Sequence, residues 1–255
     1  MMHETRTRLR WLVLAFAALA ATAAKAQPAP ERELAEATEL IQAFMANDED
    51  AIPVELLQRA RGIAVIPNVF RGGFILGGRR GRGVLTVRME NGSWSNPTFV
   101  TLTGGSIGWQ IGAESTDLVL VFANENAVKN MSTGKFTLGG DATAVAGPLG
   151  RHASLAVTFR AEVYGYLRSR GLFAGAAFEG ARLNVDDELA RMLYTADAGT
   201  VPLGPQTAAT PASARRFLLA IEQAASLPTG RPVNGIGNAP ANAPSEEART
   251  FPLPD

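Results

Sequence analysis

Residues 104–108 read GGSIG and place Ser106 in the spacing Gly-x-Ser-x-Gly. In α/β hydrolases this spacing forms a sharp turn between a strand and a helix, and the turn presents the serine hydroxyl as a nucleophile. Such a serine needs a general base, which is most often a histidine. The chain has two histidines. His3 lies in the leader described below, so His152 would have to be the base.

The surroundings of Ser106 do not favour a nucleophile. The run 98–102 has the composition of a strand, but 109–122 continues with strand-like alternation and shows no helical period. The strand–helix alternation of an α/β hydrolase is absent along the chain. We therefore interpret 104–108 as a glycine-rich bend within a strand, where Gly105 and Gly108 let backbones approach closely. The sequence predicts no catalytic residue and no enzyme activity.

Other chemical patterns are equally weak. The chain has no cysteine, and one histidine outside the leader is too few for a histidine cluster, so we predict no metal and no cofactor. The glycine-rich run 77–83 departs from the dinucleotide-binding pattern, and 131–136 departs from the phosphate-binding loop. The acidic run 186–188 is interpreted as the start of a helix, where negative charge is favourable.

The elements that position these residues are helices at both ends and strands between them. Helices are expected at 34–45, 53–60, 124–131, 186–194 and 211–225, with Asn124 and Thr210 as N-caps. Strands are expected at 63–67, 83–89, 98–102, 118–122 and 154–159, with a tight turn at Asn91–Gly92. The predicted fold class is α+β, with an antiparallel β core, sandwich-like or barrel-like, and helices at its N- and C-terminal sides.

The first 26 residues have the composition of a secretory leader. Arg6, Arg8 and Arg10 precede the apolar run 11–24, and small residues follow at 24–26. This order predicts export to a periplasm or beyond and a mature chain that starts at Gln27. The apolar run is shorter than the roughly 20 residues of a membrane-spanning helix.

Charge is balanced overall but unevenly placed. The chain has 24 basic and 24 acidic residues, yet 31–58 holds eight acidic residues against the single Arg32. The stretch 59–197 holds fifteen basic and eleven acidic residues. An acidic helical start therefore precedes a mildly basic core, and no concentrated basic stripe indicates nucleic-acid binding.

Five stretches carry a family resemblance: 60–69, 77–88, 94–121, 134–151 and 164–183. Their order and spacing resemble the SYLF lipid-binding family, over about residues 55–200 of this chain. The last block, YGYLRSRGLFAGAAFEGARL, is the most specific. The resemblance implies a module that binds anionic phospholipids. In eukaryotic members it also implies phosphoinositide recognition and, for some, actin binding.

This chain departs from that pattern at its start. Eukaryotic members bind lipid largely through a basic amphipathic N-terminal segment, whereas the matching segment here is acidic and would be repelled by an anionic membrane. Phosphoinositide recognition and actin binding are therefore not carried over. The resemblance leaves the arginines of the core as candidate lipid-binding residues, because a guanidinium can bond phosphate oxygens in pairs. They are Arg79, Arg80 and Arg82, expected in a glycine-rich turn, and Arg168 and Arg170.

The expected function is an exported, non-enzymatic module that binds anionic phospholipid headgroups or membrane surfaces. The alternative is a structural or protein-docking domain of the cell envelope without lipid specificity, and a serine hydrolase that uses Ser106 is a remote third. The expected organisation is a leader (1–26), an acidic amphipathic helical segment (27–54), the SYLF-like domain (55–225) and a disordered tail rich in Pro, Ala and Asn (226–255).

Overall fold

The structure is a computed structural model, and it describes residues 29–46, 51–132, 136–147, 161–169, 180–194 and 202–226. For 72–77, 106–114, 132, 146 and 169 it describes the backbone. The elements are, in chain order, α2 (Ala29–Ala46), α3 (Val54–Arg59), β1 (Gly62–Val87), β2 (Thr98–Phe122), α4 (Glu125–Ser132), β3 (Phe136–Thr137), β4 (Ala144–Ala146), β5 (Val163–Ser169), β6 (Arg182–Val185), α5 (Asp187–Leu193) and α6 (Ala212–Ser226). The α+β class with helices at both ends is confirmed.

The strands form one curled, mostly antiparallel sheet of six strands in the described residues, in the order β3-β6-β2-β5-β4 with β1 beside β2. Strand β2 is the centre of this sheet. Its first part, 100–103, pairs with β6, and its last part, 116–122, pairs with β5. Strands β4 and β5 are parallel, and the other paired strands are antiparallel.

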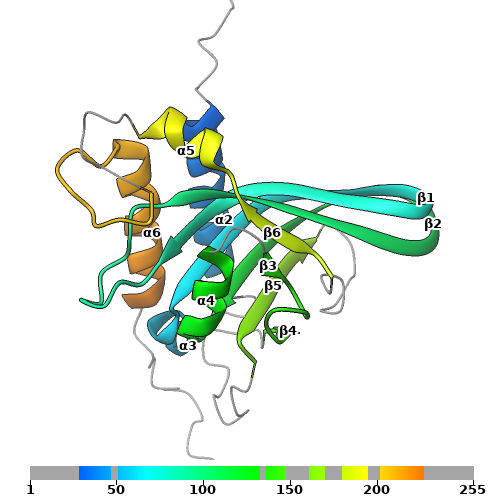
Figure 1. The fold of residues 1–255 in the computed structure, drawn as a ribbon, viewed down its shortest axis with the longest axis horizontal. Helices are drawn as coiled ribbons and strands as arrows, with labels where there is room; N and C mark the ends of the chain where they lie inside the picture. Colours follow the sequence, from blue (N-terminus) through cyan, green and yellow to red (C-terminus); the bar gives the residue numbers. More distant parts are fainter. Residues whose placement is uncertain are drawn as a thin grey trace, which may run out of the picture.

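Strands β1 and β2 form a long two-stranded ribbon that bends back on itself. The register runs from Gly62 opposite Phe122 to Leu85 opposite Thr98 and shifts near Gly73. We call 62–71 the first limb of β1, 78–87 its second limb, and 72–77 with the facing 106–112 the bend. The middle of both strands reaches far from the helices (Figure 1).

Two glycines allow the limbs to touch. A Cβ atom on Gly81 would lie 2.8 Å from Cγ2 of Val69, and a Cβ on Gly83 would lie 2.2 Å from the carbonyl oxygen of Val65. These are close backbone approaches, not turns, and the prediction of a glycine-rich turn around 77–83 is wrong. The structure instead places Arg79, Arg80 and Arg82 in a continuous strand. The glycines between and after them let the two limbs of β1 pack against each other.

The sheet is buried on both faces over much of its area, since alternate side chains of a strand point to opposite sides. One set packs with the helices in a first core and includes Ile63, Val65, Val84, Phe99, Val119 and Val121. The other set forms a second core and includes Ala64, Ile66, Leu85, Val100, Leu118 and Leu120. Two buried faces explain the nearly continuous apolar runs in 63–66 and 118–122.

Helix α2 is docked on the body of the domain. It contacts α6 and β1, and its apolar face, including Leu34, Ile41 and Phe44, is almost fully buried in the first core. Glu33 is buried with that face; burial raises the pKa of its carboxyl, and the neighbouring Glu36 adds to the rise. None of the helices in the described ranges is long and apolar enough to cross a bilayer.

Several local predictions are confirmed. Gly92 has φ +84° in the turn, and its N–H donates to the Met89 carbonyl at 2.9 Å. The Asn124 side chain accepts from Ala127 N–H at 2.8 Å at the start of α4. Asp186 accepts from Leu189 N–H at 3.2 Å, which makes the acidic run the start of α5. The Thr210 hydroxyl instead donates to Asn96 at 2.9 Å, a long-range contact that ties α6 to the loop before β2.

Some predictions lie outside the described residues. These are the leader, the strand at 154–159, the base candidate His152 and the tail from 227.

Candidate lipid-binding surface

Ser106 does not lie on a nucleophile elbow. Its backbone is inside β2, opposite Gly77, and β2 continues to Phe122 without an intervening helix. The strand–turn–helix context that exposes a catalytic serine is therefore missing. The structure also describes no group of histidine and carboxylate side chains that could hold a metal ion within its assigned ranges.

Two of the predicted arginines share one face of the ribbon. Arg80 and Arg82 are exposed, and they alternate with Val84, which places them on the side of the sheet that packs against the helices further along. Arg80 lies opposite Thr103 of β2, and Arg82 lies opposite Thr101.

The same face continues onto β6. Thr103 lies opposite Arg182, which is also exposed, so Arg80, Thr103 and Arg182 form a row across three neighbouring strands. Neighbouring strands are about 4.8 Å apart, which puts the backbones of Arg80 and Arg182 about 10 Å apart. We call Arg80, Arg82 and Arg182 the arginine face. Guanidinium groups at this spacing can bind separate phosphate groups of a surface.

The electrostatic surroundings of the arginine face change along the ribbon. At the end near the helices, Arg82 is close enough to Glu33 to oppose the rise in the pKa of that carboxyl. Toward the bend, β1 contains no acidic residue, and β2 contains none before Glu114. On the second limb, Arg80 therefore has no acidic residue opposite it, whereas Arg71 on the first limb lies opposite Glu114.

Arg79 belongs to the opposite face and has a structural role. It is half-buried, its Cγ lies 3.2 Å from where a Cβ on Gly104 would be, and its Nη2 donates to the Gly105 carbonyl at 3.3 Å. Burial lowers the pKa of its guanidinium, and the charge of Arg71 adds to this. Gly104 thus leaves room for the Arg79 side chain to cross β2, which explains part of the GGSIG pattern.

Arg168 lies on another part of the sheet. It is exposed on β5 directly opposite Asp117 of β2, while Arg80 and Arg82 face the other end of that strand. The Asp117 carboxylate also accepts the Asn68 N–H at 3.0 Å, at a bulge where Asn68 has φ +50°. An adjacent carboxylate makes Arg168 a weaker candidate for phosphate binding. Arg170 lies outside the described residues.

Sequence reasoning missed two arginines, Arg71 and Arg182. Arg71 lies at the end of the first limb, and its proximity to Arg79 follows from the bend. Arg182 lies far along the chain and reaches the arginine face through the pairing of β6 with β2. Alternation within 181–185 could have indicated that Arg182 is on the exposed side of a strand, but not which strand it pairs with.

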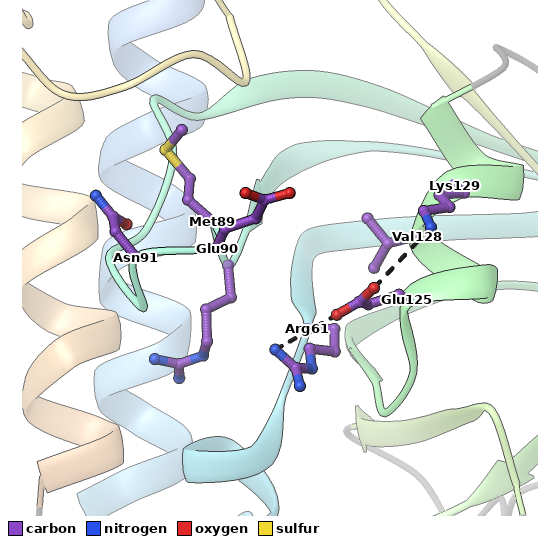
Figure 2. A pocket seen from close by; sticks show the side chains of 8 residues that line it. Arg61, Met89, Glu90, Asn91, Glu125, Val128 and Lys129 are labelled. Carbon is purple, nitrogen blue, oxygen red and sulfur yellow. Dashed lines mark ion pairs between the residues drawn. The ribbon is translucent and has the colours of Figure 1, made fainter.

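A hollow of about 550 Å³ is the other concave candidate (Figure 2). It is lined by Arg61, Arg88, Met89, Glu90, Asn91, Glu125, Val128 and Lys129. Figure 2 shows Arg61 and Lys129 directed toward Glu125, at 3.7 and 4.0 Å. The Arg88 guanidinium donates to the carbonyls of Ala60, Leu57 and Gly92 and lies 4.2 Å from the Trp94 ring centre. These three cations already have partners, so the hollow is a weaker anion site than the arginine face.

A bent β ribbon with helices at its two ends differs from the strand–helix alternation of the α/β-hydrolase class. The family model described as Las17-binding protein actin regulator, Ysc84, matches residues 103–224. Over this region the chain matches the Ysc84 family, which is the SYLF family named above, and the predicted resemblance is confirmed.

Curated relatives agree with this assignment. LAS seventeen-binding protein 3 of Saccharomyces cerevisiae is 38% identical over 151 residues, which cover 57% of this chain and 33% of the yeast protein. SH3 domain-containing YSC84-like protein 1 of Xenopus laevis is 39% identical over 149 residues, which cover 57% of this chain and 44% of the relative. The human protein of that name is 37% identical over 149 residues, covering 57% and 43%.

The chain therefore spans about a third of the length of the yeast relative and less than half of the vertebrate ones. The yeast relative is named for binding Las17, and the vertebrate relatives are named for an SH3 domain. No solved structure matches the chain.

Proposed function

We propose that this domain is a non-enzymatic module that binds anionic phospholipid surfaces through its arginine face. The observation that carries the proposal is the row of exposed arginines on β1 and β6, on a ribbon whose bend side has no compensating acid before Glu114. Basic side chains near an anionic membrane each contribute about 1 kcal/mol of attraction.

The position of α2 supports an orientation in which the arginine face, and not this helix, meets the membrane. An amphipathic helix enters a membrane with its apolar face, but that face of α2 is buried against α6 and β1. What α2 leaves exposed includes Glu31 and Glu39. Binding through the bend side of the domain keeps these carboxylates away from the anionic surface, which repels them.

Vesicle sedimentation tests the proposal. Vesicles of equal parts phosphatidylcholine and phosphatidylglycerol should retain the protein, pure phosphatidylcholine vesicles should retain much less, and retention should fall as salt is raised. Screening at physiological ionic strength acts within about 8 Å, so an exposed arginine face is sensitive to added salt. Equal retention by both vesicle types would reject the proposal.

Protein docking is the second candidate function, because the relatives' names describe Las17-binding and actin-regulating proteins. Their whole-chain partners are not transferred to this domain, since the match covers a minor part of each relative. If the domain docks on a protein and not on lipid, its retention by vesicles should not depend on lipid charge.

Export is part of the proposal, and it predicts the start of the mature chain. The basic, apolar and small-residue order of 1–26 should direct cleavage after Ala26, so the protein recovered from cells should begin at Gln27. Intact-mass measurement of the purified protein checks this. A mass that includes residues 1–26 would show a retained leader and contradict processing.

A further inference from the structure

The tight turn between β1 and β2 carries the dipeptide Asn91–Gly92 at its tip. Asn91, Gly92 and Ser93 are all exposed, and Asn91 is one of the residues that line the hollow (Figure 2). The turn is closed by two backbone bonds, from Met89 N–H to the Ser93 carbonyl and from Gly92 N–H to the Met89 carbonyl, both at 2.9 Å. The Asn91 amide is therefore open to water while its backbone is held in a defined turn.

The oxygen of the Asn91 amide accepts hydrogen bonds from two donors. Ser93 N–H donates to Oδ1 at 3.0 Å, and the Ser93 hydroxyl donates to the same atom at 2.7 Å. Donors at about 2.7–3.1 Å are the ones that stabilise an oxyanion as it develops on a carbonyl oxygen. Ser93 therefore prepares the Asn91 Cγ atom for attack by a nucleophile.

The backbone nitrogen of Gly92 is a nucleophile that the chain itself places beside this carbon. A bond from that nitrogen to Asn91 Cγ closes a five-membered ring. Glycine shields its own nitrogen least because it has no side chain, and the space where a Cβ of Gly92 would lie is empty to 4 Å. The bond from Gly92 N–H to Met89 has to open first, and an exposed turn opens at low cost in free energy.

We propose that Asn91 is a site of self-modification, at which Ser93 assists conversion of the side-chain amide into a carboxylate. The Gly92 nitrogen loses its proton and bonds to Cγ, the Cγ–Nδ2 bond breaks, and ammonia leaves with a proton. Water then opens the cyclic imide at either of its carbonyl carbons and gives aspartate or isoaspartate. The net reaction consumes water and releases ammonia, so it needs no oxidant or reductant. This inference goes beyond the proposed function and does not depend on it.

The conversion changes the charge and the shape of the hollow. The charged residues that line it are three basic and two acidic ones: Arg61, Arg88, Lys129, Glu90 and Glu125. A carboxylate at position 91 balances these charges, and attraction to the basic residues favours the product. Isoaspartate also lengthens the main chain by a methylene group, so the two bonds that close the turn cannot both keep their geometry.

Peptide mapping by tandem mass spectrometry tests this on the folded full chain, incubated at mildly alkaline pH. Asn91 should convert, and faster as pH rises, because the Gly92 nitrogen must lose its proton. The internal control is Asn126, which is also exposed but is followed by alanine within α4, and it should remain an asparagine. If Asn91 converts in the urea-unfolded chain but not in the folded protein, the turn protects it and the proposal is wrong.

Variants at the turn test the part that Ser93 plays. Ser93→Ala removes one donor to Oδ1 and should slow the conversion about fivefold, the effect of one hydrogen bond of ordinary strength. Ser93→Thr keeps the hydroxyl and should convert at the rate of the wild type, and Asn91→Gln should not convert, because its amide carbon cannot close the five-membered ring. Circular dichroism establishes that each variant is folded. An equal or faster conversion in folded Ser93→Ala would overturn the proposal.

Discussion

Gly83→Ala is expected to destabilise the domain by about 3 kcal/mol or more, because overpacking a tight contact costs 1–3 kcal/mol and backbone atoms cannot rotate away as a side chain does. The added Cβ would lie 2.2 Å from the Val65 carbonyl oxygen and 2.7 Å from the Ile66 Cα. The two limbs of β1 would have to separate at this contact. Urea unfolding followed by circular dichroism measures the loss.

Gly105→Ala is the matched control, since it makes the same chemical change in the same ribbon. A Cβ at Gly105 meets nothing within 4 Å, so the expectation of close packing at this glycine is wrong. The substitution should be neutral or stabilise by up to about 1 kcal/mol, through the lower entropy of the unfolded chain. Similar unfolding midpoints for the two variants would contradict the contact between the limbs.

Local signals in the sequence identified the helix starts and the turn well. Asn124 and Asp186 accept the expected backbone N–H groups, and Gly92 has the expected positive φ. Each of these features is decided within a few residues, where side-chain hydrogen bonding and glycine's freedom at φ act directly.

The length of β1 could not be predicted in the same way. Glycines normally end strands, so the run 77–83 indicated a turn between short strands. In the structure, Gly81 and Gly83 lie within a strand of 26 residues because the first limb packs against them. That contact joins parts of the chain that meet through the bend, and no window of sequence contains the reason for it.

The candidate site was predicted in part. The sequence indicated Arg79, Arg80 and Arg82 as a set, but strand alternation divides them: Arg80 and Arg82 point to the arginine face, and Arg79 crosses β2. Arg182 completes that face through the register of β6 with β2. Which arginines act together is therefore a property of strand pairing, not of spacing along the chain.

The acidic helix α2 fits binding through the arginine face. Its apolar face stabilises the body, its exposed carboxylates include Glu31 and Glu39, and the helix itself lies away from the bend (Figure 1). Negative charge is thus concentrated on α2, and positive charge on the arginine face. Such a division orients a protein at an anionic surface even when its net charge is zero.

Replacing Arg80, Arg82 and Arg182 together by alanine should lower affinity for phosphatidylglycerol-containing vesicles by about 3 kcal/mol, roughly a hundredfold, at about 1 kcal/mol per arginine. All three side chains are exposed, so the unfolding free energy should change little. Vesicle sedimentation at low salt measures the affinity, and the difference from wild type should shrink as salt is added.

The control for this variant replaces Arg59, Arg191 and Arg216 by alanine. These are also exposed arginines, and the change in net charge is identical, but they lie on α3, α5 and α6. Binding driven by net charge alone would weaken equally in both variants, which would reject a localised site. Binding through the arginine face predicts a large loss in the first variant and a small one in the second, because exposed charges farther from the membrane than a Debye length are largely screened.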